Sequence, residues 1–142
     1  MAAHPVGGTI NRMTLKGSKV AARLPAQDLD RARAWYAEKL GLEPSDERPG
    51  GILYRMGGCE FALFASAGAP SGAHTQMGFE VEDLDAVVAE LRDRGVVFEE
   101  YEGGRGIAEI EGNYPSKGAR GERAVWFRDC EGNMLGVGQL VR

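Results

Sequence analysis

Apolar and polar residues follow the same order of elements twice along the chain. Residues 75–82 alternate between apolar and polar or small side chains, which predicts a half-buried strand, and an equivalent strand is expected at residues 20–27. An Asp-Leu-Asp sequence follows each strand, and apolar residues then recur at helical spacing. Asp28 and Asp83 occupy the expected N-cap positions, where a carboxylate accepts free backbone N–H groups of the first turn. Each half of the chain therefore begins with a strand and a capped helix.

Further strands are expected after each helix. The helices should end at Gly41 and Gly95, because glycine readily takes the left-handed conformation that closes a helix. The pattern predicts strands at residues 51–56 and 60–66 in the first half, and at residues 96–101, 124–128 and 134–140 in the second. The sequence thus predicts an α+β fold built from a tandem repeat of strand–helix–strand–strand–strand.

Glycine-rich and polar segments set the expected domain boundaries. We expect a first βαβββ module at residues 18–67 and a second at residues 74–142. Residues 1–17 show no hydrophobic period and are expected to be a disordered tail, and residues 68–73 are expected to link the modules. The second module contains a long glycine-rich loop at residues 102–123, and loops of that length are usually functional lids or disordered segments.

Composition excludes several classes of protein. The chain has 142 residues and a net charge of −4, which argues against gripping nucleic acid through overall charge. No apolar stretch approaches the ~20 residues that span a bilayer, and no secretory signal is recognisable, so we expect no membrane partner. Cys59 and Cys130 cannot form a disulfide framework and are expected to be reduced thiols of a cytoplasmic protein.

Several short sequences complete the pattern in a fixed order. They are Asp28–Ala32, Trp35-Tyr36, Leu40–Leu42, Phe79–Asp85, Arg94–Val96 and Phe127–Asn133. Together, over about residues 19–140, they resemble the vicinal oxygen chelate superfamily, the group of glyoxalases, bleomycin-resistance proteins and extradiol dioxygenases. In the last sequence Cys130 stands where that family usually has proline. The resemblance implies two βαβββ modules whose curved mixed sheets form a central cavity, often completed by a dimer partner, and we therefore expect a homodimer.

The resemblance also implies where metal ligands would lie. Metal-dependent members hold one divalent cation with four side chains, and the corresponding positions here are Ala21, Ala62, Gln76 and Gly136. Only Gln76 offers a donor atom, through a neutral amide, whereas a divalent catalytic site needs about three or more protein ligands. We therefore expect these positions to be vacated, with no metal and no cofactor.

Strand alternation predicts what surrounds the vacated positions. Phe127 fits the helix-packed core, so its neighbour Trp126 should face the concave side. The expected ligand-binding residues are Arg23, Phe64, Gln76, Trp126, Met134 and Tyr114, the last on the long loop, which is expected to be a mobile flap over the cavity. Alternatively, Trp126 and Phe64 plug the cavity as core residues, while Trp35 and Tyr36 belong to the core stripe of their helix.

Two functional hypotheses remain open at this point. The first is a metal-free binding protein that sequesters a planar or aromatic hydrophobic molecule, such as an antibiotic. The second is a lyase, isomerase or dioxygenase relative that uses an unusually held metal, or Glu80 as a base, because Glu80 should face the cavity. The second hypothesis rests on family resemblance alone.

Overall fold

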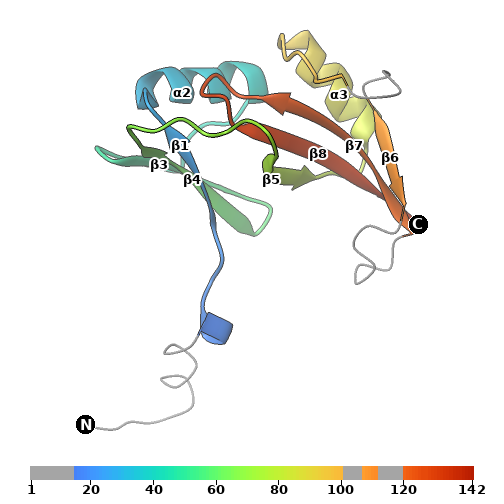
Figure 1. Ribbon diagram of the computed structural model, residues 1–142, viewed down its shortest axis with the longest axis horizontal. Coiled ribbons are helices and arrows are strands. Elements are labelled where there is room, and N and C mark those ends of the chain that lie inside the picture. Colours follow the sequence, from blue (N-terminus) through green and yellow to red (C-terminus); the bar gives the residue numbers. More distant parts are fainter. Residues whose placement is uncertain (1–14, 101–106, 112–119) are drawn as a thin grey trace, which may run out of the picture.

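The computed structural model describes residues 15–100, 107–111 and 120–142. Among these residues, a short 3-10 turn precedes the first module, which has two helical segments and four strands, and the second module has one helix and four strands. Figure 1 shows their arrangement. In chain order the elements are η1 (Leu15–Gly17), β1 (Ala22–Ala26), α2 (Leu29–Trp35), the π-helix η2 (Tyr36–Leu40), β2 (Asp46–Arg48), β3 (Gly51–Met56), β4 (Cys59–Ala65), β5 (Thr75–Glu80), α3 (Leu84–Asp93), β6 (Ala108–Glu111), β7 (Gly121–Arg128) and β8 (Met134–Val141).

The helix boundaries follow the predicted caps. Asp28 accepts a hydrogen bond from the backbone N–H of Arg31 at 3.0 Å, and Asp83 accepts one from Ala86 at 3.1 Å. These bonds satisfy N–H groups that have no partner within the helix. Gly41 has a φ of 70°, a left-handed conformation that ends η2.

The two sheets share one topology. The first sheet has the order β1-β4-β3-β2 and the second has the order β5-β8-β7-β6. In each sheet the first and last strands of the module pair in parallel, and the other neighbours pair antiparallel. The sheets stand side by side, with α2 and α3 on the same side of them (Figure 1). The predicted α+β fold of two βαβββ modules is confirmed.

Each sheet ends in a short edge strand, β2 in the first sheet and β6 in the second, that the sequence pattern did not predict. β2 was not predicted, and residues 96–100, the described part of the strand predicted at 96–101, contain only an isolated bridge from Phe98 to Phe127. The backbone N–H of Val96 instead bonds to Leu91 and continues the end of α3. The second strand of the second module is β6, which lies within the segment predicted as a flap.

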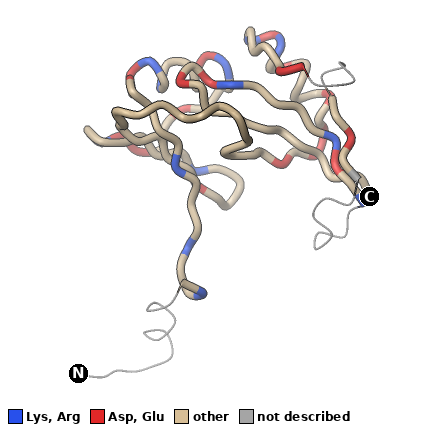
Figure 2. The backbone as a smooth tube through the Cα atoms, in the orientation of Figure 1, with Lys and Arg blue, Asp and Glu red and all other residues tan. Residues whose placement is uncertain are grey.

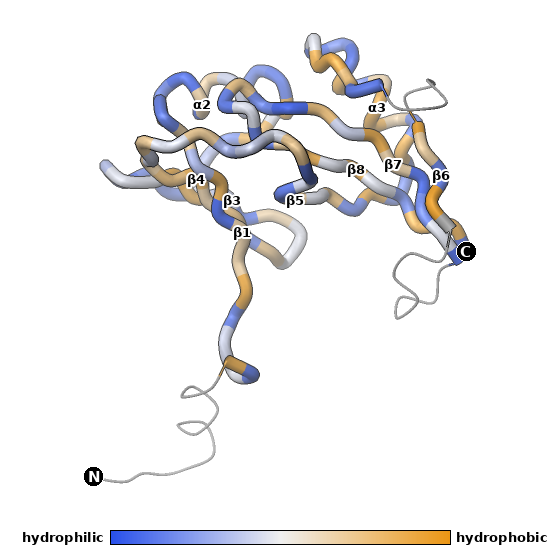
Figure 3. Tube along the Cα trace, viewed as in Figure 1, coloured by the Kyte–Doolittle hydropathy of each residue, from blue (hydrophilic) through white to orange (hydrophobic). Residues whose placement is uncertain are grey.

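That prediction of a flap at residues 102–123 is therefore wrong in part. Ala108–Glu111 pairs antiparallel with Gly121–Ala124, so both segments are strands of the second sheet. Alternation explains the strand, because Ala108 and Ile110 are followed by glutamates, a half-buried pattern that Figure 3 shows along β6. Tyr114 and most of the other residues of the predicted flap lie outside the described residues.

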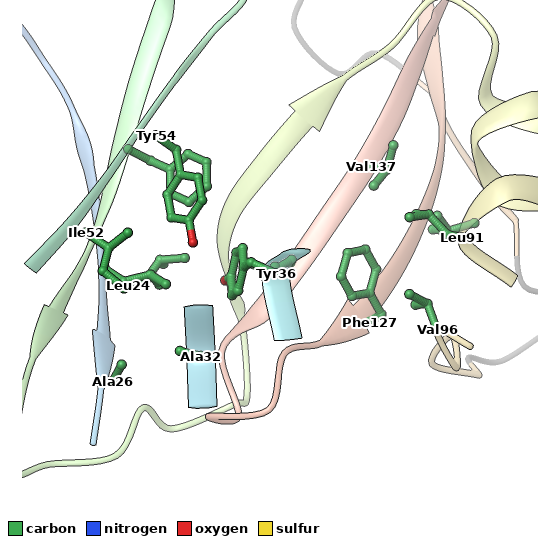
Figure 4. Close-up of a cluster of buried hydrophobic side chains, with 14 of the residues drawn as sticks. Leu24, Ala26, Ala32, Tyr36, Ile52, Tyr54, Leu91, Val96, Phe127 and Val137 are labelled. Atoms are coloured by element: carbon green, nitrogen blue, oxygen red, sulfur yellow. The ribbon is translucent and has the colours of Figure 1, made fainter. Parts of the chain in front are cut away.

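One hydrophobic core joins the two modules (Figure 4). The Trp35 ring stacks on Phe127 with 6.3 Å between centroids, and Phe61 meets Phe79 edge-on at 6.1 Å. Tyr36 is fully buried between the sheets. The prediction that Trp35 and Tyr36 belong to the core is confirmed.

A buried polar turn between β7 and β8 fastens the second module to the first. The Tyr36 hydroxyl donates to Asp129 at 2.7 Å, and Asp129 also accepts from the backbone N–H groups of Glu131 and Asn133 at 2.9 Å. The Asn133 amide donates to the carbonyl of Pro25 in β1 at 3.0 Å. The turn therefore sets the position of β8 relative to β1.

Glu131 in the same turn binds the start of the first helix. Its carboxylate accepts from the backbone N–H groups of Gln27 at 2.7 Å and Asp28 at 3.1 Å, and from the Arg31 guanidinium at 2.9 Å. Burial alone would raise the pKa of Glu131, but these hydrogen bonds lower the pKa by more than burial raises it. The net shift is therefore downward. Cys130 beside it is half-buried, and burial raises the pKa of its thiol to about 11, which disfavours the thiolate form.

Candidate functional site: a cavity on the second sheet

A cavity of about 360 Å³ lies on the second sheet and opens to solvent. Its walls come from β5, β6, β7 and β8, and residues of the first sheet do not line it. Alternation places the cavity on the face of the sheet away from α3, because Val125, Phe127 and Leu135 on the other face are fully buried in the core. The second module thus forms the site without the concave face of the first.

Glycines of β8 make the floor of the cavity. A Cβ atom on Gly136 would lie 3.1 Å from Trp126 Nε1 and 3.5 Å from the Thr75 methyl group. A Cβ atom on Gly138 would lie 2.9 Å from Cδ of Glu122. Side chains of β5 and β7 therefore lean over β8 at positions where any larger residue would displace them.

Trp126 forms one wall, as the alternation of β7 predicts. It pairs with Gly136 across the sheet and is half-buried, whereas Phe127 is fully buried on the opposite face. The predicted facing of this strand is confirmed. The cavity remains open beside the indole, so Trp126 lines it and does not fill it.

Two carboxylates lie at the Gly138 end of the cavity. Glu80 on β5 is the cross-strand partner of Gly138, and Glu122 on β7 lies against the same glycine. Both residues line the cavity, together with Ile110 of β6. Figure 2 shows acidic positions along this part of the second sheet. The cavity therefore combines an aromatic wall with two acidic residues at one end.

The other residues predicted for ligand binding lie elsewhere. Arg23 of β1 and Phe64 of β4 are on the first sheet and do not line this cavity. Met134 begins β8, opposite Thr75 and Arg128, and also lies outside the cavity lining. The structure brings together Trp126 and Glu80 from the predicted set and adds Thr75, Glu122 and Ile110.

A β-bulge explains why Thr75 and not Gln76 faces the cavity. The register of β5 against β8 changes from Thr75 with Met134 to Met77 with Leu135, which leaves Gln76 as the extra residue. The Gln76 Oε1 atom is buried and has no hydrogen-bond partner among the described residues. Strict alternation could not reveal the bulge. The place of Glu122 in the cavity wall, in contrast, would have been predicted if the strand expected at 124–128 had been extended by two residues at its start.

The residues present do not fit the metal centre of the metal-dependent relatives. Ala21 and Ala62 have no donor atom, and the space beside Gly136 that a ligand side chain would need is taken by Trp126 and Thr75. Gln76 alone supplies an oxygen, which is insufficient for a divalent cation. Within the described ranges, no three His, Cys, Asp or Glu residues are grouped as metal ligands would be.

Comparison with known proteins agrees with this fold. The sequence model of the Glyoxalase/Bleomycin resistance protein/Dioxygenase superfamily matches residues 10–137, and the chain belongs to this superfamily. No curated protein matches the chain significantly. Among the described residues, no helix is long and apolar enough to cross a membrane.

Solved structures show the same architecture at low sequence identity. A glyoxalase/bleomycin resistance protein/dioxygenase from Alicyclobacillus acidocaldarius is 18% identical, with 88% of this chain and 92% of that chain covered and a TM-score of 0.69. A protein of the same description from Nocardioides is 20% identical over 94% of this chain and 91% of that chain, with a TM-score of 0.63. A lactoylglutathione lyase from Agrobacterium tumefaciens is 20% identical over 86% and 92%, with a TM-score of 0.56. These likenesses establish the fold.

Proposed function

We propose that the protein binds a planar or aromatic small molecule in the cavity of the second sheet, without a metal ion, and sequesters it. The observation that carries the proposal is the contact of Trp126 with Gly136. Metal-dependent relatives have a metal-ligand side chain at this position. This chain has Gly136 there, and the Trp126 indole from the neighbouring strand β7 occupies the space. Small ligands are commonly held by apolar and aromatic walls with a few placed polar groups.

Sequestration of a toxic planar compound, an antibiotic for example, is the biological role that this chemistry suits. A binding protein needs a cavity and an aromatic wall but no nucleophile, base or metal. Cys59 and Cys130 are unpaired, which suits action in the reducing cytoplasm.

A homodimer is part of the proposal. Leu15 and Val20, which precede β1, are 92% and 96% exposed, and a second copy of the chain would remove such apolar side chains from water. The edge strands β1 and β5 also offer backbone groups for pairing. We expect light scattering at micromolar concentration to give twice the chain mass, and a single subunit mass would contradict the dimer.

The test of function is a thermal-shift screen of planar aromatic natural products, combined with metal analysis of the purified protein. We expect at least one compound to raise the melting temperature of the wild type and to lose this effect in Trp126→Ala. Elemental analysis should find no stoichiometric divalent metal. A tightly held metal at one per chain, or a ligand that stabilises both proteins equally, would overturn the proposal.

A further inference from the structure

We propose that two copies of the chain exchange their N-terminal arms, residues 15–21, and that Leu15 of each copy enters an apolar cavity between the two modules of the other copy. This inference rests on the homodimer included in the proposed function, and it names the surfaces that meet in that dimer. It does not depend on which ligand the cavity of the second sheet binds.

The receiving surface is a cavity at the seam between the modules, on the helix side of the sheets. It has a volume of about 130 Å³, opens to solvent and is lined by nine side chains, all of them apolar. Leu40 and Met56 come from the first module, and Val87, Leu91 and Val137 are among those from the second. Apolar cavities of about this size favour an apolar group over water. The cavity therefore suits a single aliphatic side chain.

The N-terminal arm supplies such a side chain. Residues 15–21 are all exposed, and Figure 1 shows that they lead away from the fold. Leu15 and Val20, the large apolar residues of the arm, are 92% and 96% exposed. The Leu15 carbonyl accepts from the backbone N–H of Ser18 at 3.0 Å and from the Ser18 hydroxyl at 2.6 Å, which closes a short turn. The arm thus presents Leu15 on a formed turn that its own fold does not cover.

The arm and the cavity lie near the same end of the first sheet. Ala22 at the start of β1 pairs with Phe61, and Met56 of the cavity pairs with Cys59, two residues earlier in β4. Neighbouring strands are about 4.8 Å apart, so the arm leaves β1 about 10 Å from Met56. Because the arm leads away from its own fold, it must reverse to reach its own cavity. A two-fold axis beside this end brings each arm to the cavity of the other copy instead.

The charges of the arm favour a second copy of the chain as the partner. Residues 1–21 contain three basic residues and no acidic one, so, with −4 for the whole chain, residues 22–142 carry a net charge of −7. Glu43 and Glu82 are exposed, and each directly follows a residue of the cavity wall. Lys16, next in the chain to the inserted leucine, would meet this acidic surface. Opposite charges of this kind attract and orient two partners.

The first experiment measures the dimer dissociation constant of the full chain by sedimentation equilibrium. We expect Leu15→Ala to weaken the dimer at least about tenfold, because each copy loses a buried side chain. Val97→Ala is the matched control, since Val97 is 82% exposed but lies neither on the arm nor in the cavity wall. It should change the dissociation constant by less than about twofold. Lys16→Gln should weaken the dimer at low salt and reduce the salt dependence of its affinity.

A mixing experiment distinguishes exchange between copies from other uses of the arm. Met56→Arg places a cation in the cavity wall, where it opposes the basic arm, and leaves the arm itself intact. Leu15→Ala has the complementary defect, because its cavity is intact. A heterodimer of the two variants keeps one complete contact between arm and cavity, whereas each variant alone keeps none. We therefore expect the mixture to associate more tightly than either variant by itself.

The outcomes separate this inference from the function on which it rests. A wild-type dimer that Leu15→Ala weakens no more than Val97→Ala does, or a mixture that associates no better than its components, would overturn the inference and leave the homodimer in place. A monomeric wild type would overturn the inference together with the homodimer, and the thermal-shift screen would still test ligand binding separately. Melting curves of each variant show that lost association is not a lost fold.

Discussion

The indole of Trp126 lies across Gly136, with its Nε1 atom 3.1 Å from the point that a Cβ atom on the glycine would occupy. The two residues are direct partners in the β7–β8 ladder, so the contact is fixed by the register of the sheet. An aromatic wall held in this way is pre-organised to stack on a planar ligand.

Replacing Trp126 should therefore weaken binding more than replacing any core aromatic residue. We expect Trp126→Ala to weaken binding of a planar ligand by about 2–4 kcal/mol, the scale of an interface hot spot. Trp35→Phe should leave affinity nearly unchanged, because Trp35 packs on Phe127 in the core. A fluorescence titration measures both, and quenching that persists in the first variant but vanishes in the second would contradict the site.

Gly136 is also expected to matter for ligand binding, because it leaves room for the Trp126 indole. In Gly136→Ala the new methyl group meets the indole, which must shift by a few tenths of an ångström, so we expect the affinity for a planar ligand to fall several-fold. Gly78→Ala is the control, since a Cβ atom there lies 3.8 Å from its nearest neighbour, the Gly136 carbonyl. Equal effects of the two substitutions in a calorimetric titration would show that the Trp126 position is not what ligand binding requires.

The fold was largely predictable because most local signals agreed with the repeat, although β6 takes the place of the strand expected at residues 96–101. Asp28 and Asp83 cap their helices and Phe127 faces the core, as their spacing requires. The site was only partly predictable, since periodicity carries no information about the bulge that turns Gln76 away and brings Thr75 over Gly136. Alternation within a strand also could not show which residues on the concave faces line the same cavity. That depends on the placement of the two sheets, and Arg23 of the first sheet does not line the cavity that contains Trp126.

The buried hydroxyl groups of two neighbouring tyrosines offer a test of how the modules are joined. The Tyr36 hydroxyl donates to buried Asp129, so Tyr36→Phe leaves that carboxylate short of a donor, and we expect a loss of about 1–3 kcal/mol in unfolding free energy. Tyr54 lies 5.7 Å from Tyr36 between ring centroids, and its hydroxyl is buried with no hydrogen-bond partner in the described part of the chain. Tyr54→Phe should therefore be neutral or stabilising in urea denaturation. If both variants lost a similar amount of unfolding free energy, the loss would come from altered ring packing and not from the missing hydrogen bond to Asp129.

The carboxylate of Glu131 should make the stability of the protein depend on pH in mildly acid solution. Its pKa in the folded protein lies below the ordinary 4.5, because hydrogen bonds from Gln27, Arg31 and Asp28 outweigh the opposing effect of burial. A depressed pKa contributes stability that is fully present above the unfolded value and is lost as the pH falls through the folded value. We therefore expect the unfolding free energy to fall below about pH 4.5, and Glu131→Gln to lower it at pH 7 while flattening this acid limb. Asp85→Asn is the control, since its lowered pKa comes from an exposed pair with Arg123, and exposed ion pairs contribute little. Urea titrations between pH 3 and 7 measure the slope, and an unchanged acid limb in Glu131→Gln would show that another group governs acid unfolding.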